Sequence, residues 1–136
     1  MNKAAKGKIE ISSTLDDVSK IEKFVDDYLQ QIHISEDLYG KIFLATIEAA
    51  NNAVTHGNKL DASKNVYLEL EVKHDELIID IKDMGDGFDY ENLPDPTAPE
   101  NIEKPDGRGI FIISQLSDKL EFNEKGNEMR ITFNIV

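Results

Sequence analysis

The segment that ends at Gly57 carries three polar side chains with a spacing that suits chemistry. Glu48, Asn52 and His56 stand at i, i+4 and i+8, so on an α-helix they project from nearly one face. A carboxylate one turn from a carboxamide suits phosphoryl transfer, because the carboxylate can orient a hydroxyl or water and the neutral amide oxygen can bind Mg²⁺. Taken alone, however, the segment is better explained as a polar helix end that Asn and Gly merely terminate.

A second candidate segment follows a predicted strand and reads Asp83-Met-Gly85-Asp-Gly87. A carboxylate at a strand end can accept a hydrogen bond from the exocyclic amine of a base, and the glycines let a flat ring approach the backbone. An EF-hand calcium loop is excluded, because Gly85 stands where the third ligand is required and Phe88 stands where that loop needs glycine. In isolation, an Asp-Gly turn is the default explanation of this segment.

The third candidate segment is Gly107-Arg108-Gly109, which opens a predicted helix. Glycines at a helix start expose backbone N–H groups at the positive end of the helix dipole, where anions bind. The dinucleotide-binding fingerprint is excluded, because Ile112 stands where its third glycine belongs. Arg108 is either a phosphate contact or simply a solvated charge.

Composition limits the partners that such a site can have. The chain has 15 Lys+Arg against 27 Asp+Glu, a net charge of −12, which repels phosphate backbones and anionic membranes, so neither nucleic acid nor a membrane is an expected partner. Cysteine is absent, which excludes disulfides, a thiolate nucleophile and cysteine-ligated metals. No stretch approaches the length of a membrane span, and the start lacks a signal-peptide core. We therefore expect a cytoplasmic protein, and any nucleotide must arrive with a cation.

The elements that must position these segments are predicted by hydrophobic spacing. Helices show an apolar residue every three or four positions, and strands alternate apolar and polar residues. In chain order we expect a short strand around Ile9 and Ile11, helices over 15–32 and 36–56, a hairpin of strands over 66–72 and 77–81, a helix over 107–116, and a last hairpin of strands over 119–123 and 128–136.

The segment 84–106 contains all four prolines and is long for a connection, which is typical of a lid or a disordered segment. Hairpins with separate helices favour an α+β fold, a two-layer sandwich of a mixed, mainly antiparallel sheet with helices on one face. A length of 136 residues suits one ordinary domain, so we expect a single domain over 1–136.

Together, the three segments resemble the N, G1 and G2 boxes of the GHKL ATPase superfamily, which includes gyrase, histidine kinases and MutL. The order agrees as well as the letters: E-x-x-x-N-A-x-x-H on a helix, D-x-G-x-G after a strand, a variable lid, then G-x-G opening a helix. The runs 51–58, 107–113 and 124–128 look like those of the bacterial anti-sigma-factor serine/threonine kinases. The resemblance implies a Bergerat-type, histidine-kinase-like ATP-binding fold with an ATP lid at about 88–106.

The resemblance also implies roles for residues in all three boxes. These are Glu48 as the general base, Asn52 as the Mg²⁺ ligand, His56 at a recurrent nucleotide-binding position, Asp83 as the carboxylate that receives the adenine amino group, Gly85 and Gly87 in the base pocket, and Gly107, Arg108 and Gly109 in the phosphate-binding turn. Near the start of the last strand many members carry Thr, where this chain reads Asn127-Glu128-Met129.

The function implied by this resemblance is that of a Mg-ATP-dependent protein serine/threonine kinase with ATP and Mg²⁺ as cofactors. Its expected partners are a sigma factor and a small serine-bearing antagonist of the anti-sigma factor, in a homodimer. The alternative is a non-catalytic module of the same fold that uses the nucleotide only to control partner binding. A sensor histidine kinase is disfavoured, because no phosphoacceptor hairpin precedes the ATP-binding segments.

Overall fold

The computed structural model describes residues 6–85 and 105–135, leaving aside the side chains of 105–108. Its helices and strands are β1 (Gly7–Ser12), α1 (Leu15–Leu29), α2 (Glu36–Asn52), the π-helical turn η1 (Ala53–Gly57), β2 (Asn65–Lys73), β3 (Glu76–Lys82), α4 (Pro105–Leu116), β4 (Lys119–Phe122) and β5 (Glu128–Asn134). The predicted lid at 88–106 lies outside the described residues except for its last two positions, which belong to α4. Gly87 also lies outside them.

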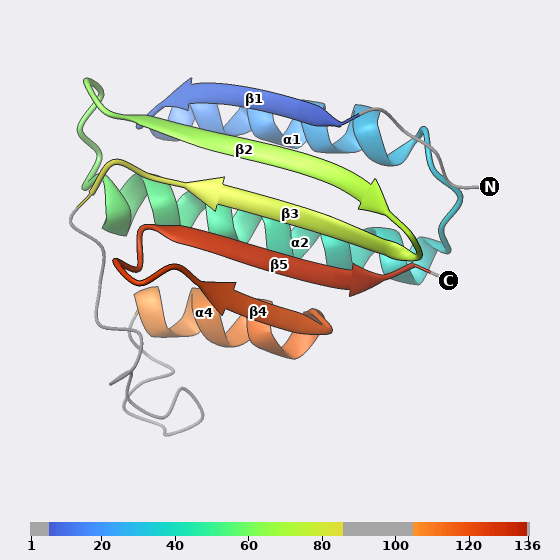
Figure 1. The fold of residues 1–136 in the computed structure, drawn as a ribbon. Helices are drawn as coiled ribbons and strands as arrows, with labels where there is room; N and C mark the ends of the chain where they lie inside the picture. Colours follow the sequence, from blue (N-terminus) through green and yellow to red (C-terminus); the bar gives the residue numbers. More distant parts are fainter. Residues whose placement is uncertain (1–5, 86–104, 136) are drawn as a thin grey trace.

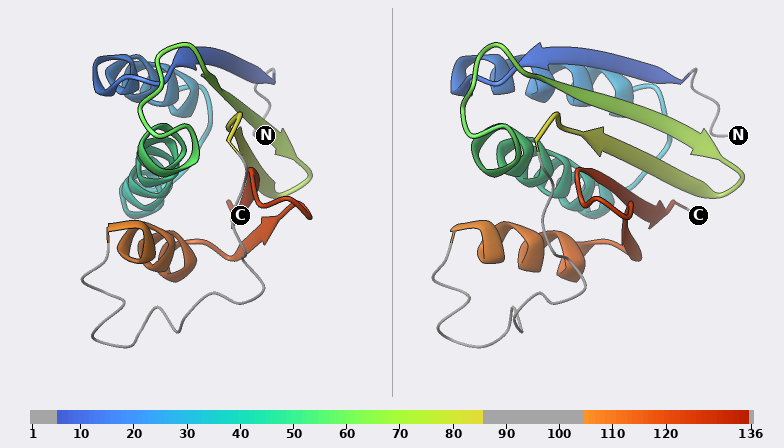
Figure 2. Two further views of the ribbon diagram at one scale, coloured as in Figure 1. Left: turned by 90° about the vertical axis from the view of Figure 1, so that its left-hand side faces the viewer. Right: turned by 60° about the vertical axis from the view of Figure 1, so that its left-hand side comes forward.

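The described strands form a 5-stranded sheet in the order β1-β2-β3-β5-β4. β3 is its centre, and Ile81 of β3 stands opposite Leu68 of β2 on one side and Met129 of β5 on the other. Figure 1 shows α1, α2 and α4 behind this sheet, and Figure 2 shows the helices in one layer and the strands in the other. The predicted α+β sandwich is confirmed, and each pairing among the described strands is antiparallel.

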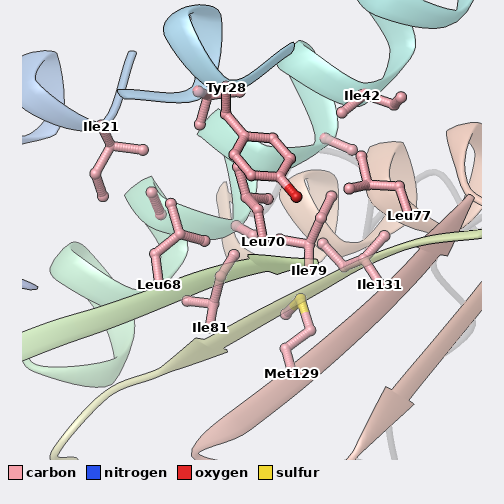
Figure 3. Close-up of a cluster of buried hydrophobic side chains, with 14 of the residues drawn as sticks. Ile21, Tyr28, Ile42, Leu68, Leu70, Leu77, Ile79, Ile81, Met129 and Ile131 are labelled. Carbon is pink, nitrogen blue, oxygen red and sulfur yellow. The ribbon is translucent and has the colours of Figure 1, made fainter. Parts of the chain in front are cut away.

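The core lies between the sheet and the helices. Inward positions of β2, β3 and β5 are apolar and buried, whereas the outward positions are mostly polar. Figure 3 shows these side chains meeting apolar residues of α1 and α2. The largest fully buried side chains among the described residues include Phe133, Leu68, Leu70, Leu77, Ile79 and Ile131 on the strands and Ile21, Leu29, Ile42 and Ile113 on the helices. Each buried side chain of this size stabilises the fold by about 1.5–3 kcal/mol. Packing therefore fixes where the helices lie on the sheet.

Side-chain caps determine where α1 and α2 begin. The N–H of Asp17 donates to Thr14 Oγ1 at 3.2 Å, and the N–H of Leu38 donates to Ser35 Oγ at 3.1 Å. Both helices have acidic residues in the first turn, where a negative charge is favoured by the helix dipole. Such a cap contributes about 1 kcal/mol. Both starts agree with the prediction from the sequence.

The end of α2 departs from the predicted single α-helix over 36–56. The α-helical part ends at Asn52, and Ala53–Gly57 forms the wider π-helical turn η1. The N–H of Asn58 donates to the carbonyl of Ala53, five residues earlier, at 2.8 Å. π-helical turns are rare in proteins overall, and those that do occur are often found at functional sites.

The start of α4 also differs from the prediction. The helix begins at Pro105, earlier than the expected start at Gly107. Proline is favoured at the first helical position, because its φ angle suits the helix and no partner is needed there for an N–H group. The glycines of the third candidate segment therefore lie within the first turns of α4.

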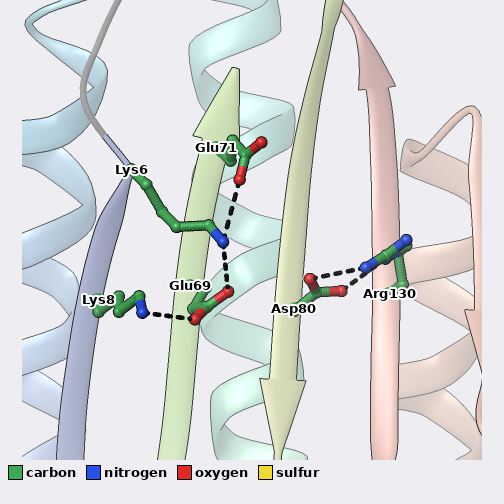
Figure 4. A network of polar contacts seen from close by, with 6 residues as sticks. All are labelled: Lys6, Lys8, Glu69, Glu71, Asp80 and Arg130. Carbon is green, nitrogen blue, oxygen red and sulfur yellow. Dashed lines mark hydrogen bonds and ion pairs between the residues drawn. The ribbon is translucent and has the colours of Figure 1, made fainter. Parts of the chain in front are cut away.

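The described part of the molecule has a polar surface, and ion pairs cover the sheet face that is turned away from the helices (Figure 4). Arg130 makes a bidentate contact with Asp80, with 2.8 Å between Nε and Oδ1, and Lys8 Nζ lies 3.4 Å from Glu69. Exposed pairs contribute at most about 1 kcal/mol each, so they hydrate this face more than they stabilise it. No helix in the described ranges is long and apolar enough to cross a membrane.

Candidate functional site

The three candidate segments meet at one end of the sandwich. α2 packs against α4, and Gly109 near the start of α4 lies against Glu48 of α2. Gly57 at the end of η1 lies against Asp83, which directly follows β3. In Figure 1 this is the left-hand end, where β3 finishes and where the chain leaves α2 for β2. The fold thus brings together segments that are far apart in the sequence.

Asp83 lies in a largely buried position at this end. Its side chain is 9% exposed, and its Oδ1 accepts a hydrogen bond from the N–H of Gly85 at 2.8 Å. Burial raises the pKa of Asp83 above its ordinary value, while the Gly85 N–H and the charges of Lys125 and Lys64 act in the opposite direction. A carboxylate with so little water around it is a strong acceptor for a ligand N–H group.

Two glycines form the immediate surroundings of this carboxylate. A Cβ on Gly57 would overlap Asp83 Oδ2, and a Cβ on Gly85 would overlap the carbonyl oxygen of Gly57. The sequence predicts Gly57 only as a helix stop and Gly85 only as a residue of the base pocket. In the structure both glycines are required by the close packing of η1 against the residues that follow β3.

Glu48 faces the beginning of α4. Its side chain is half-buried, and its Oε2 lies 3.6 Å from the position that a Cβ on Gly109 would take. Because α4 starts at Pro105, the N–H groups without partners inside the helix belong to residues 106–108. The predicted catalytic carboxylate and the predicted phosphate-binding turn are therefore neighbours.

Asn52, one helical turn after Glu48, has a buried Oδ1 with no hydrogen-bond partner in the described structure. Leaving such an oxygen unpaired costs about 1–3 kcal/mol, so an unpaired one calls for an explanation. A neutral amide oxygen is a suitable ligand for Mg²⁺. Among the described residues no cluster of His, Asp and Glu can hold a metal by itself. The unpaired Oδ1 of Asn52 therefore fits one ligand position of Mg²⁺.

The described contacts do not place the remaining predicted residues against Glu48, Asn52 or Asp83. His56 is exposed on η1, where the α-helical spacing that relates Glu48 to Asn52 no longer applies. Gly107 and Arg108 lie in the first turns of α4, and nothing is described of their side chains. Their predicted roles stay predictions.

Two asparagines that the sequence analysis does not assign to the site contact the Asp83 segment, although Asn127 stands near the start of the last strand, where many family members carry Thr. Asn58 accepts from the N–H of Met84 through Oδ1 at 2.7 Å, and Asn127 donates through Nδ2 to the carbonyl of Asp83 at 3.1 Å. Sequence reasoning places Asn58 in a polar loop and Asn127 in a hairpin turn. Their types gave no signal, because asparagine is common in both settings. Only their burial, at 1% and 9% exposure, distinguishes them.

A separate cavity of about 550 Å³ lies at the other end of the sheet. It is bounded by the α1–α2 connection and the end of β5, with Ile32, Leu38, Asn134 and Ile135 among its lining residues. Asn134 pairs with the start of β3, whereas Asp83 follows the end of that strand. No predicted site residue lines this cavity, so it is not part of the candidate site.

Comparison with known proteins identifies the family. The profile of the histidine kinase-like ATPase domain matches residues 11–133. The chain belongs to the histidine kinase-like ATPase family. Its membership agrees with the three boxes predicted from the sequence.

Relatives of this chain include an anti-sigma factor and a serine-protein kinase. The anti-sigma F factor of Clostridium perfringens is 31% identical over 112 residues, which cover 79% of this chain and 79% of that protein. The serine-protein kinase RsbW of Staphylococcus aureus is 33% identical over 97 residues, or 65% of this chain and 61% of that protein. The predicted resemblance to anti-sigma-factor kinases is confirmed.

A solved structure supports the same fold. The crystal structure of the RsbU and RsbW domains of a Mycobacterium tuberculosis protein aligns with 96% of this chain and 32% of that chain, at a TM-score of 0.63 and 16% identity. At this identity the likeness shows the fold alone.

Proposed function

We propose that this chain is a cytoplasmic Mg-ATP-dependent protein serine/threonine kinase of the anti-sigma type. It transfers the γ-phosphate of ATP to a serine of a small antagonist protein and binds a sigma factor, as a homodimer of single domains over 1–136. The names of its relatives, anti-sigma F factor and serine-protein kinase, motivate the activity and the two partners.

The observation that carries this proposal is the unpaired Oδ1 of Asn52, one helical turn from the Glu48 carboxylate. A polar helix end with only a structural role would satisfy its buried oxygen. A kinase, by contrast, needs an oxygen ligand for a phosphate-bound metal close to a carboxylate that orients the nucleophile.

Nucleotide binding is divided between two parts of the site. Asp83, seated against Gly57, accepts a hydrogen bond from the 6-amino group of adenine. The N–H groups of the first turn of α4 receive the phosphates at the positive end of the helix dipole. Asn52 would hold Mg²⁺ through Oδ1, and the ion would supply positive charge for the phosphates, which the acidic protein otherwise repels.

Phosphoryl transfer requires one further group, and Glu48 supplies it. The carboxylate orients the hydroxyl of the substrate serine and accepts its proton as the oxygen attacks. A bond forms between the serine oxygen and the γ-phosphorus, the bond from that phosphorus to the β–γ bridging oxygen breaks, and ADP leaves. Gly109 lies against Glu48, so the start of α4, where the phosphates are received, is next to the carboxylate.

The test uses labelled ATP and the proteins that the chain captures from its host lysate. The chain is incubated with the lysate in the presence of Mg-ATP, Mg-ADP or no nucleotide, and captured proteins are identified and examined for phosphoserine. We expect different partners in the ATP and ADP states and label on a small serine-bearing protein. The same incubation with Glu48→Gln controls for other kinases, because label should be lost while nucleotide-dependent capture remains.

The outcomes separate the kinase from the non-catalytic alternative. Capture that depends on nucleotide, with no phosphoserine on any partner, would favour a module that uses ATP only as a ligand. Identical capture in all three conditions, together with no measurable ATP binding by calorimetry, would reject both.

A further inference from the structure

Two side-chain amides hold the backbone that carries the Asp83 carboxylate. Asn58 accepts from the N–H of Met84 at 2.7 Å, and Asn127 donates to the carbonyl of Asp83 at 3.1 Å. The N–H of Asp83 in turn donates to the carbonyl of Asn127 at 2.9 Å. The contacts come from two elements, the end of η1 and the turn before β5. They leave this backbone little freedom to shift.

Asn58 is itself fully bonded. Its Nδ2 donates to Ser13 Oγ at 2.8 Å and to the carbonyl of Asn65 at 3.0 Å. Ser13 Oγ donates to the carbonyl of Lys64 at 2.7 Å, so its lone pair is directed to Asn58. A flipped amide would set Oδ1 against the Asn65 carbonyl and Nδ2 against the N–H of Met84. The partners therefore fix the orientation of the amide.

Asn127 is held in a comparable way within its turn. Its Oδ1 accepts from Nδ2 of Asn123 at 2.7 Å, which leaves Nδ2 of Asn127 to donate to Asp83. Asn123 Oδ1 also accepts from the N–H groups of Gly126, Asn127 and Glu128 at 2.7, 3.1 and 3.2 Å. This turn is therefore a rigid support for the Asp83 backbone.

We infer that Asn58 and Asn127 are positioning residues that set the purine specificity of the site by fixing the Asp83 carboxylate. The inference rests on the proposed function, in which Asp83 receives the 6-amino group of adenine. A hydrogen bond to that group needs an N···O distance of about 2.7–3.2 Å and weakens steeply when misaligned. Both asparagines act through the backbone of Asp83 and Met84, and neither is assigned a contact with the base.

The experiment measures what the 6-amino group contributes to binding. Dissociation constants for Mg-ATP and for the Mg complex of purine riboside triphosphate, in which hydrogen replaces that group, are measured by calorimetry for the wild type, Asn58→Ala and Asn127→Ala. The wild type should prefer ATP about tenfold, as expected for one hydrogen bond to a charged acceptor. In each variant this ratio should fall to about twofold, while affinity for the analogue changes by less than about twofold.

Ser13→Ala is the matched control. It removes one partner of Asn58 but leaves the bond from Met84 to Asn58, so the melting temperature should fall while the preference for ATP stays at the wild-type value. Should Asn58→Ala fail to fold, Asn127→Ala decides the matter alone, because the backbone bond from Asp83 to Asn127 remains in that variant.

Three results would contradict the inference. A wild-type ratio in Asn58→Ala and Asn127→Ala would overturn it and leave the role of Asp83 intact. A ratio that falls in Ser13→Ala in step with melting temperature would also overturn it, because general weakening would then be the cause. A wild type that binds both nucleotides equally would overturn the proposed role of Asp83 and the inference with it.

Discussion

No side chain fits at position 57 while Asp83 keeps its place, because a Cβ on Gly57 would overlap Asp83 Oδ2. The carboxylate is thus seated against the main chain of η1 rather than against another side chain. Gly85 is required for the same packing, because the carbonyl oxygen of Gly57 occupies the position that a Cβ on residue 85 would take. The position of Asp83 depends on two glycines that belong to different segments.

Gly57→Ala should therefore weaken ATP binding as well as stability. We expect the methyl group to displace the Asp83 carboxylate, to lower the free energy of unfolding by about 1–3 kcal/mol and to weaken ATP binding about tenfold. Calorimetry and thermal melts measure the two effects. Gly40→Ala is the control, because no atom beyond its chain neighbours and the nearby backbone of α2 lies within 4 Å of its Cβ position. It should raise stability by about 0.5–1 kcal/mol with unchanged ATP affinity.

Asn52→Ala should separate stability from metal-dependent binding. Removing an unpaired buried oxygen relieves its cost, so the free energy of unfolding without nucleotide should stay unchanged or rise by about 1 kcal/mol. Affinity for Mg-ATP should fall, and the dependence of ATP binding on Mg²⁺ should be lost. Asn51→Ala on the same helix is the control and should keep both. A marked loss of stability in Asn52→Ala would argue for a structural role instead.

Glu48→Gln should slow transfer without preventing binding. The amide keeps the shape of the side chain but cannot accept the serine proton, so the transfer rate should fall by about 10² or more. Affinity for Mg-ATP should remain within about twofold of the wild type. Glu22→Gln, an exposed change on α1, controls for the loss of one negative charge. Normal turnover in Glu48→Gln would remove Glu48 from the proposed mechanism.

The raised pKa of Asp83 predicts opposite pH trends for stability and binding. The folded protein holds the Asp83 proton more tightly than the unfolded chain does, so this group lowers stability as pH rises from about 4 through its raised pKa. ATP affinity should increase over the same range, because the ionised carboxylate is a stronger hydrogen-bond acceptor for the adenine amine than the neutral acid is.

Comparison with Asp83→Asn isolates this carboxyl group from the other titrating groups. Urea titration at several pH values measures the free energy of unfolding of both proteins. As pH rises, the free energy of unfolding of the wild type should fall relative to that of the variant. As pH rises, the ATP affinity of the wild type should increase relative to that of the variant. Taking the ratio of the two affinities cancels the titration of the phosphates. A difference that does not vary with pH would mean that burial does not perturb Asp83.

Local patterns in the sequence were enough to predict most elements and the three boxes. The alternation around Leu68 and Ile79 predicts the central strands, and hydrophobic spacing predicts helix starts at 15 and 36, which directly follow the caps Thr14 and Ser35 in the structure. Glu48 and Asn52 lie on one helix, as their spacing indicates. These features depend on neighbours within one or two turns of chain, which is the range over which sequence patterns are informative.

The features that the sequence did not predict depend on contacts between distant segments. The π-helical turn is followed by Asn58, whose amide is bonded to Ser13, Asn65 and Met84. Nothing near Asn58 in the chain indicates those partners. For the same reason, the seat that Gly57 provides for Asp83 becomes visible only when the two segments are placed together.

The pairing of Lys82 with Glu128 gives the folding reaction an order. β2 and β3 are joined by a tight turn, whereas the β3–β5 ladder closes only after the long intervening chain has been brought round. Closing long loops costs entropy and slows folding, so we expect 105–135 to dock last. Asp83 belongs to the early part and Asn127 to the late part. The proposed nucleotide site joins Asp83 of the early part to the first turn of α4 in the late part. A bound nucleotide would therefore oppose the first step of unfolding, and saturating Mg-ATP should lower the unfolding rate in stopped-flow experiments far more than it raises the folding rate.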